Sequence, residues 1–573
     1  MPQNSKFSCS TKLQGFSSII LLMLCHFIST AQSNQFISDS TKNKIDSLLK
    51  QWDSPNTPGG AVGIIRNDSL IYARGYGMAD LEQKISITPQ SVFYMCSLTK
   101  QFTGYSIALL IRHGKVKLDD DIHVYLPWMP DFGKRITVSN LLHHTSGIRD
   151  DISLAAIAGL SLDGMLTQDG ALQLLKKQRT LNFEPGEKFS YSNSNYILLA
   201  EIVKKVSGQS FRAFVDSAIF KPLAMINSKI VDDNQEVVTN RVPSYYSPDG
   251  KTYKNIYQNI YTLGDGGLFT NIDDMARWAM NFYNTKAGDQ NDIELTTQKG
   301  KLNNGKENAY AFGIAIDSNR GWKRLSHNGG LAGYNTVINI YPDLKIAFIV
   351  FGNGGDGSAY GKPDELAELF IPDNRKKSPS SNSNPFQRDS ADTYLDNLEK
   401  YKILTGDYIE QDGYHISCAI KNNQLWVNDR LLLAHDSGYH FTLSFYSPAK
   451  YDFHVTTSGG YLELTSPEFE KPLHMVKADR DTTSSDAVLA QYVGNYYCPE
   501  LDCNHQIVLK NHRLYFTNNN RPDAAIRLFG KDYMQSDGDM DNIVVSRKKN
   551  GDIQGFELND GSTEHLRFNK TNW

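Results

Sequence analysis

The chain has 573 residues, which is too long for one hydrophobic core, so two or three domains are expected. Hydrophobic residues make up 40% and charged residues 21%, and these ordinary globular values exclude a largely disordered chain. The formal net charge is −4 without a basic block, which argues against a nucleic-acid partner.

The first segment has the pattern of a secretory signal peptide. Lys6 and Lys12 precede an apolar run over residues 16–28, and small residues follow as far as Ala31. This run is too short for a comfortable membrane anchor, which needs about 20 residues. We predict a signal peptide over residues 1–31, a periplasmic or secreted protein, and no stable membrane insertion after cleavage.

Strand-like and helix-like stretches alternate over residues 32–373. Turn residues between apolar runs predict two hairpins, 61–65 with 70–73 and 336–341 with 346–351. Apolar residues at helical spacing predict helices over 198–206 and 272–282, the second opened by a capping box of Thr270 and Asp273. The predicted class is α+β, an antiparallel sheet flanked by helices with a helical region inserted within it.

The character of the chain changes after a polar segment at residues 374–392, which is predicted to be a linker. Short alternating runs then predict an all-β region with a weak internal repeat: Gly406 precedes Leu425 by 19 positions, and Gly494 precedes Leu514 by 20. Two small barrels, over residues 393–480 and 487–573, would leave no exposed strand edges. One larger β-sandwich is the alternative.

Four cysteines follow the predicted signal peptide. Cys498 and Cys503 stand close together, and export would favour a disulfide between them. Cys96 is expected to be a small buried apolar residue rather than a nucleophile. No pair of Cys or His residues completes a zinc pattern, so neither a metal nor a cofactor is predicted.

Ser97 and Lys100 are the first candidate catalytic residues. Their spacing of three places both side chains on one face of a helix, and the apolar run at 107–111 supports a buried helix that begins near Ser97. A serine needs a neighbouring base to become a good nucleophile. Burial and the positive end of a helix both disfavour the charged form of a lysine. The pattern therefore predicts Ser97 as nucleophile and Lys100 as its base.

Two further motifs follow along the chain. Tyr191 and Asn193 stand two positions apart in a Tyr-Ser-Asn run, so an extended or tightly turned backbone can direct both into one cavity. Residues 326–330 read Ser-His-Asn-Gly-Gly and are expected to precede a strand. Their glycines would let the backbone approach a substrate closely.

The order and intervals of these three motifs, Ser-x-x-Lys, Tyr-x-Asn and His-x-Gly, resemble those of the class C β-lactamases, D-alanyl-D-alanine carboxypeptidases and D-aminopeptidases. Segments 136–148 and 266–270 resemble further stretches of these penicillin-recognising serine hydrolases. The resemblance covers most of residues 40–372 and implies a β-lactamase/transpeptidase-like domain. The two predicted barrels look like a lipocalin-like arrangement in D-aminopeptidases, where a barrel loop borders the active site and limits substrate length.

The resemblance implies a role for each matching residue. Ser97 would attack a carbonyl and become acylated, while Lys100 takes or shares its proton. Tyr191 would relay a proton to the leaving group and later help activate water. Asn193 would bind the substrate amide and Lys100. These roles describe a hydrolase that works through an acyl-serine intermediate.

The third motif supplies the remaining candidates. The backbone amides of Ser97 and Gly330 would form the oxyanion hole, where such a donor contributes about 3 kcal/mol to transition-state stabilisation. Asn328 and Gly329 are further substrate-binding candidates. His327 is a catalytic candidate that stands where many relatives carry a lysine, and histidine is mostly neutral near pH 7. A small peptide, amide or ester is therefore expected as substrate before a β-lactam.

Other functions remain open from the sequence. Glu187 and the pair His143-His144 are expected to brace loops rather than to take part in catalysis. A non-catalytic homologue that binds cell-wall peptides is the second hypothesis. A third makes the aromatic C-terminal region a carbohydrate- or lipid-binding module, although barrels are commonly filled by their own side chains. The sequence leaves the oligomeric state undetermined.

Overall fold

The computed structural model describes residues 37–161, 164–375, 395, 397–410, 415–428, 431–443, 449–456, 459–465, 471–478, 480–481, 484–518, 521–530, 532–537, 540 and 542–571. The predicted signal peptide, and the predicted linker apart from its first two residues, lie outside these ranges. Within them, no helix is long and apolar enough to cross a membrane.

A six-stranded antiparallel sheet forms the centre of the first domain, and every neighbouring pair of its strands runs antiparallel. Both predicted hairpins are present in it. In the first hairpin, Asn67 takes the left-handed conformation (φ 54°) in the turn between the strands over 60–66 and 69–76. In spatial order the strands are β14 (Ala315–Asn319), β15 (Trp322–Leu331), β16 (Tyr334–Tyr341), β17 (Ile346–Gly352), β1 (Gly60–Arg66) and β2 (Ser69–Tyr76).

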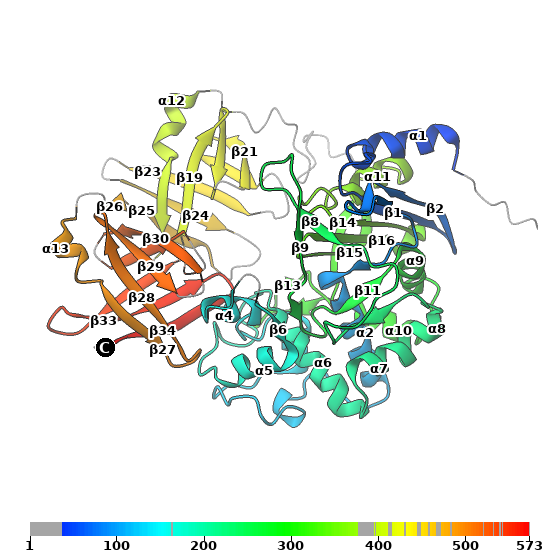
Figure 1. Ribbon diagram of the computed structural model, residues 1–573, viewed down its shortest axis with the longest axis horizontal. Helices are drawn as coiled ribbons and strands as arrows, with labels where there is room; N and C mark the ends of the chain where they lie inside the picture. Colours follow the sequence, from blue (N-terminus) through cyan, green and yellow to red (C-terminus); the bar gives the residue numbers. More distant parts are fainter. Residues whose placement is uncertain are drawn as a thin grey trace, which may run out of the picture.

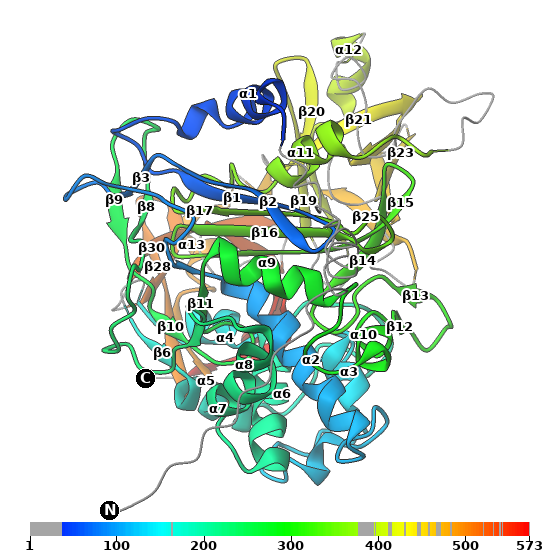
Figure 2. The same ribbon diagram turned by 90° about the vertical axis from the view of Figure 1, so that its right-hand side faces the viewer.

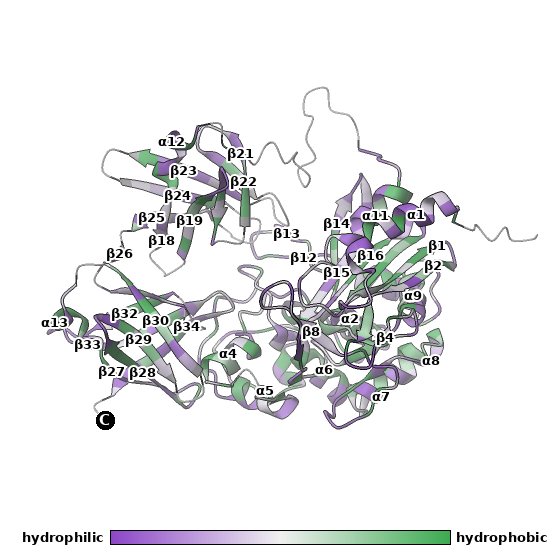
Figure 3. Ribbon diagram, turned by 45° about the horizontal axis from the view of Figure 1, so that its top comes forward, coloured by the Kyte–Doolittle hydropathy of each residue, from purple (hydrophilic) through white to green (hydrophobic). Residues whose placement is uncertain are grey.

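Helices cover both faces of this sheet (Figure 2). α1 (Asp39–Leu48) and α11 (Lys362–Phe370) pack on one face, and α9 (Ile272–Asn281) packs on the other. Every residue of β16 and β17 is buried between the helical layers, where hydrophobic residues gather (Figure 3). The buried centre of the sheet thereby supports the neighbouring strand β15, which carries the third motif at residues 326–330.

The helical region lies beyond α9. Its helices are α2 (Thr99–Arg112), α3 (Val138–Leu142), α4 (Asp151–Ile157), α5 (Gln168–Lys176), α6 (Asn193–Ser207), α7 (Phe211–Val215), α8 (Lys221–Leu223) and α10 (Gln290–Thr296). Short strands connect them: β3 (Met78–Asp80), β4 (Ile85–Ser86), β5 (Phe93–Tyr94), β6 (Leu166–Thr167), β7 (Lys229–Ile230), β8 (Ser244–Tyr246), β9 (Lys254–Ile256), β10 (Ile260–Tyr261), β11 (Leu268–Thr270), β12 (Gly300–Lys301) and β13 (Glu307–Asn308).

The predicted cap of the helix over 272–282 is wrong. The side chain of Asn271 caps α9 by accepting the backbone N–H of Asp274. Thr270 instead ends strand β11, where it pairs with Phe93, and its hydroxyl is 2.7 Å from that of Ser228. Strand pairing therefore fixes Thr270 in an extended backbone one residue before the helix can begin.

Two eight-stranded barrels follow, rather than one β-sandwich (Figure 1). The first has short helix α12 (Leu398–Tyr401) before it and comprises β18 (Gly406–Ile409), β19 (His415–Lys421), β20 (Gln424–Val427), β21 (Leu431–Ser437), β22 (His440–Leu443), β23 (Lys450–Thr456), β24 (Gly459–Thr465) and β25 (Leu473–Ala478).

The second barrel closes through pairing of β30 with β31, and short strand β26 (Arg480–Asp481) joins β30 from outside. Helix α13 (Asp486–Leu489) precedes its strands, β27 (Gly494–Cys498), β28 (Cys503–Lys510), β29 (Arg513–Asn518), β30 (Arg521–Phe529), β31 (Tyr533–Ser536), β32 (Ile543–Arg547), β33 (Ile553–Asp560) and β34 (Thr563–Thr571).

The weak sequence repeat corresponds to a repeated structural device. Gly406 and Gly494, with φ 130° and 149°, open the first strand of each barrel. Two residues later, Tyr408 and Tyr496 each donate a hydroxyl hydrogen bond to the carbonyl four residues earlier, at 3.1 and 2.6 Å. The repeat therefore marks the same tethered tyrosine at the start of both barrels.

The two barrels relate differently to the first domain. Buried side chains of the second barrel form one continuous hydrophobic core with the first domain, whereas the first barrel has a core of its own. The second barrel lies against α4 and α5 (Figure 1), and its His505 ring contacts the carbonyl of Ile157 at the end of α4. The second barrel is thus built into the body that carries the three motifs.

Candidate active site

Ser97 lies in a single turn of 3-10 helix, Cys96–Leu98, which leads directly into α2. The backbone of Cys96 is left-handed (φ 51°), an unusual conformation for a side chain with a Cβ atom, and the residue is buried as expected. This turn places Ser97 at the positive end of a helix of 14 residues. The nucleophile candidate is therefore held on a sharp turn that favours developing negative charge.

Lys100 follows one helical turn later and is fully buried. Its Nζ lies 3.0 Å from Ser97 Oγ, 2.8 Å from Asn193 Oδ1 and 3.0 Å from the backbone oxygen of Asp265. The two carbonyl oxygens can only accept, whereas the serine hydroxyl can donate or accept. A neutral amine would donate to both carbonyls and accept the serine proton, and an ammonium would donate to all three oxygens. The same three contacts thus satisfy Lys100 before and after it takes the proton of Ser97.

Asn193 is held in turn by Asp150, which the sequence did not identify. One carboxylate oxygen of Asp150 accepts the backbone N–H and the side-chain Nδ2 of Asn193, at 2.7 and 2.9 Å. The other oxygen caps α4 by accepting two backbone N–H groups, each at 3.1 Å. These bonds fix which end of the Asn193 amide faces Lys100, so the amide oxygen is the atom presented to Nζ.

Tyr191 lies in the loop that leads into α6, with its ring centroid 5.0 Å from Lys100 Nζ. Glu187 braces this loop by accepting the N–H of Glu184 at 3.0 Å. His143 binds the backbone oxygen of Tyr310 through Nδ1 at 2.8 Å, which is also a bracing contact. The Tyr-x-Asn motif therefore contacts Lys100 from a loop far from Ser97 in the sequence. Contacts of Glu187 and other nearby residues hold this loop in place.

His327 is close to these groups but its ring is fully engaged. Nδ1 lies 2.6 Å from the carbonyl of Asn328 and therefore donates, so Nε2 accepts the Tyr310 hydroxyl at 2.7 Å. Burial, with a further contribution from the charge of Lys100, lowers the pKa of His327 to about 3. His327 thus offers no positive charge to a substrate at neutral pH. Tyr310, its partner, was not identified from the sequence.

The third motif lies within strand β15, and strand β16 follows it along the chain as the sequence predicted. Gly329 faces the turn before Ser97, where an added Cβ would lie 2.6 Å from the carbonyl oxygen of Met95. An added Cβ at Gly330 would lie 2.3 Å from the Tyr360 hydroxyl. Gly329 therefore lets β15 lie close against the turn that carries Ser97, while the predicted close approach to a substrate stays a prediction.

Two buried carboxyl groups lie near Lys100. Asp265 Oδ2 accepts the Thr262 hydroxyl at 3.0 Å, and Asp151 Oδ1 accepts that of Ser194 at 3.3 Å. Burial raises the pKa of both carboxyls, and the neighbouring acidic groups raise that of Asp151 further. The raised pKa values favour the neutral, protonated form of both carboxyls. Together they therefore place less negative charge beside Lys100 than two ionised carboxylates would.

The second barrel reaches this site through its β33–β34 hairpin. The carbonyl of Ser562 accepts the backbone N–H of Asp150 at 3.2 Å and Asn182 Nδ2 at 3.0 Å. The carboxylate of Glu564 accepts Lys188 Nζ at 2.9 and 3.1 Å. The hairpin therefore contacts Asp150, which holds Asn193, and the segment 182–188 that leads into the Tyr-x-Asn loop.

A buried arginine completes this interface. Arg149 Nη1 donates to Glu500 Oε2 at 2.7 Å, and their side chains are 0% and 9% exposed. Glu500 lies in the loop between Cys498 and Cys503, which are paired positions of β27 and β28 and carry free thiols in this structure. Arg149 immediately precedes Asp150, so the barrel loop is tied to the segment that holds Asn193.

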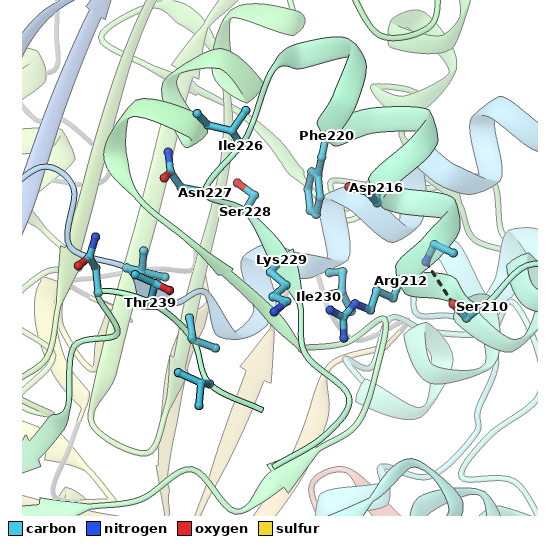
Figure 4. Close-up of a pocket in the computed structure, with 15 residues that line it drawn as sticks. Ser210, Arg212, Asp216, Phe220, Ile226, Asn227, Ser228, Lys229, Ile230 and Thr239 are labelled. Carbon is cyan, nitrogen blue, oxygen red and sulfur yellow. Dashed lines mark hydrogen bonds between the residues drawn. The ribbon is translucent and has the colours of Figure 1, made fainter. Parts of the chain in front are cut away.

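A hollow of about 680 Å³ lies elsewhere, between α7, β7 and residues 237–240 (Figure 4). Arg212 on its wall is bound by both carboxylate oxygens of Glu236, at 2.7 and 2.9 Å. None of the predicted site residues lines this hollow. The hollow is therefore separate from the residues of the three motifs.

The structure brings Ser97, Lys100, Tyr191, Asn193, His327 and Gly329 together with Asp150, Asp265 and Tyr310, whereas Asn328 is exposed on β15. Asp150 lies two residues after the end of the family-like segment 136–148, which is the one sequence signal that pointed towards it. Asp265 immediately precedes the other family-like segment, 266–270, and so had a similar signal. Tyr310 had none, because its contact with His327 depends on tertiary packing.

Comparison with known proteins agrees with this geometry. The family model described as Beta-lactamase matches residues 44–371. D-aminopeptidases of Brucella canis and Gluconobacter oxydans are each 28% identical over 305 and 296 residues, which is 52% of this chain. The match spans 58% and 56% of the length of those proteins.

The fold has solved counterparts. The octameric penicillin-binding protein homologue from Pyrococcus abyssi is 22% identical, with a TM-score of 0.53 over 76% of this chain and 99% of that one. The penicillin binding protein from Bacillus halodurans is 21% identical, with a TM-score of 0.50 over 57% of this chain and 99% of that one.

Proposed function

The chain belongs to the beta-lactamase family of serine hydrolases, and we propose that it cleaves an amide or ester bond through an acyl intermediate on Ser97. One observation carries this proposal, the placement of Lys100 Nζ among Ser97 Oγ, Asn193 Oδ1 and the Asp265 carbonyl. That arrangement can receive the proton of Ser97 without moving. A peptide-binding homologue without catalysis would have no need of it.

The proposed acylation uses these groups in sequence. Ser97 Oγ attacks the substrate carbonyl while its proton passes to Lys100 Nζ. The backbone amides of Ser97 and Gly330 stabilise the oxyanion by hydrogen bonds. Tyr191 gives its hydroxyl proton to the leaving nitrogen or oxygen and recovers one from Lys100, so that the bond to the leaving group breaks and the proton balance is restored.

Deacylation reverses the proton path. A water molecule attacks the acyl carbon while Tyr191 takes its proton and passes its own hydroxyl proton to Lys100 Nζ, and the tetrahedral intermediate collapses with release of the acid. Ser97 Oγ then recovers a proton from the same relay. Asn193 holds the acyl side of the substrate through its amide, whose orientation Asp150 fixes.

We propose amides and peptides of D-amino acids as the substrate class, ahead of β-lactams. The relatives named D-aminopeptidase support this choice. The neutral state of His327 supports it as well, because this position supplies no fixed cation for the carboxylate of a β-lactam. Export, which the N-terminal pattern predicts, would give such an enzyme access to cell-wall peptides.

The β33–β34 hairpin supports a further part of the proposal, that the second barrel limits substrate length. Deletion of residues 391–573 is a poor test, because the second barrel shares a hydrophobic core with the first domain. Replacement of the hairpin tip at residues 561–562 is better. Altered preference between short and long D-peptides would support the proposal, and unchanged length selectivity would contradict it.

A substrate panel tests the proposed activity, with Ser97→Ala as control. It contains D-aminoacyl amides, D-Ala-D-Ala peptides, p-nitrophenyl esters and nitrocefin. We expect cleavage of the esters and D-aminoacyl amides to exceed that of nitrocefin, and every rate to depend on Ser97. No cleavage of any member would favour the non-catalytic alternative, and preferred cleavage of nitrocefin would overturn the substrate class.

A further inference from the structure

His144 is a buried residue that contacts both the ring of Tyr191 and the backbone on either side of it. The residue is fully buried and follows α3 with a left-handed backbone (φ 54°). Its carbonyl accepts the N–H of Ser190 at 2.9 Å, and its Nδ1 accepts the N–H of Ser192 at 3.2 Å. These two donors are the chain neighbours of Tyr191, so one residue holds the backbone on both sides of it.

The ring of His144 also packs on the ring of Tyr191. Their centroids are 4.3 Å apart at an interplanar angle of 33°. Tyr310 and Tyr196 complete the surroundings of the imidazole, with centroids 4.7 and 5.1 Å away. Tyr191 is therefore restrained in its ring position as well as in its backbone.

The protonation state of His144 follows from its partners. Nδ1 accepts a second hydrogen bond, from Asn195 Nδ2 at 3.1 Å, and so carries no proton. Burial, reinforced by the charge of Lys100, holds the pKa of the ring well below its usual range. The imidazole is neutral with its proton on Nε2, an atom that has no hydrogen-bond partner among the described residues.

Packing alone does not explain this residue. An apolar side chain would fill the same space without a buried N–H that lacks a partner, which is unfavourable, and histidine is among the residues that tolerate the left-handed backbone. The two accepted hydrogen bonds and the ring contact instead converge on the Tyr-x-Asn loop. The buried N–H without a partner therefore belongs to a residue whose carbonyl and Nδ1 hold the backbone on both sides of Tyr191.

We propose that His144 is a positioning residue that holds the Tyr191 hydroxyl in place for proton transfer to the leaving group. This inference rests on the proposed function, because Tyr191 matters only in a hydrolase. His144 itself does not touch the reacting atoms. Its contribution is to keep Tyr191 in one ring position, since a small displacement of a catalytic group can cost about 100-fold in rate.

Two substitutions separate the contacts of His144. His144→Asn keeps an acceptor near Nδ1 and suits a left-handed backbone, but it removes the ring that packs on Tyr191. His144→Phe keeps a ring and removes the acceptor of the Ser192 N–H. We expect each to lower kcat/KM about 10- to 100-fold, with little change in the binding of a substrate analogue.

A comparison of two leaving groups distinguishes loss of proton transfer from a general loss of structure. The p-nitroanilide and p-nitrophenyl ester of one acyl group differ in whether the departing atom needs a proton. We expect the loss in kcat/KM to be larger for the anilide than for the ester. In a Tyr191→Phe background, His144→Asn should cause less than about a two-fold further loss, because the two residues act as one unit.

His143→Asn is the matched control, since His143 is an adjacent buried histidine without a ring contact to Tyr191. It should affect anilide and ester alike. Rates are expressed per site labelled by a fluorophosphonate, so that incomplete folding does not enter the comparison. Equal losses on both substrates, or full multiplication with Tyr191→Phe, would overturn the role of His144. Failure of the wild-type protein to be labelled would instead overturn the proposed function.

Discussion

Asp150 provides a sharp test of how the site is held together. Its carboxylate serves two sets of donors, the backbone and side-chain N–H groups of Asn193 and the start of α4. Asp150→Ser retains a good N-cap residue for the helix, but the shorter side chain does not reach Asn193. The substitution therefore removes the support of Asn193 and leaves the helix start in place.

The expected loss follows from the two contacts. A hydrogen bond to a charged acceptor contributes about 1.5–3 kcal/mol, so the pair holds Asn193 by roughly 3–6 kcal/mol. Asn193 Oδ1 in turn orients Lys100 at 2.8 Å. If about half of that energy is expressed in the transition state, kcat/KM falls roughly 10- to 150-fold.

The assay is steady-state hydrolysis of an amide or ester that the wild-type protein cleaves. Asp289→Ser is the matched control, because Asp289 caps α10 in the same way and contacts none of the site residues. We expect this control to keep kcat/KM within about two-fold of wild type. Wild-type kcat/KM in folded Asp150→Ser would refute the role given to Asp150.

Three further predictions concern other parts of the structure. Glu500→Ala leaves the buried Arg149 unpaired and should destabilise the protein by about 3–5 kcal/mol, whereas Asp502→Asn, in the same loop but exposed, should cost less than about 1 kcal/mol by calorimetry. Burial keeps the pKa of His327 near 3, so it gains a proton on unfolding below its ordinary pKa of about 6.5. Thermal stability should therefore fall from pH 6.5 towards 3, and His327→Gln should flatten that slope. Gly329→Ala places a Cβ 2.6 Å from the Met95 carbonyl oxygen beside the turn that carries Ser97 and should lower kcat at least about 10-fold in the same hydrolysis assay, whereas an unchanged kcat would contradict this close packing.

Local pattern was sufficient for much of the fold. The hairpins and helices of the first domain were predictable because alternating and helical periodicities depend on neighbouring residues. The repeat around Gly406 and Gly494 likewise indicated two barrels. The cap of α9 was missed because strand pairing of Thr270, a tertiary contact, decides where the helix begins. Closure of the second barrel through β30 and β31 had no sequence signal.

The candidate site likewise contains residues that local sequence pattern identified and residues that depend on tertiary contacts. Ser97 and Lys100 were recognisable because three residues fix their geometry on a helix. Asp150 and Tyr310 were not, since they reach Asn193 and His327 across 43 and 17 positions of the chain. The state of His327 was also only partly foreseeable. A histidine near neutral pH was expected to be mostly uncharged, but its engagement by Tyr310 follows from burial and packing.

The central claim is that Ser97 is the nucleophile, and mass-spectrometric mapping of a fluorophosphonate adduct tests it most directly. The account predicts a single adduct on the peptide that contains Ser97, no adduct in Ser97→Ala, and much slower labelling in Lys100→Ala. An adduct on another residue, or full hydrolase activity in Ser97→Ala, would contradict the account.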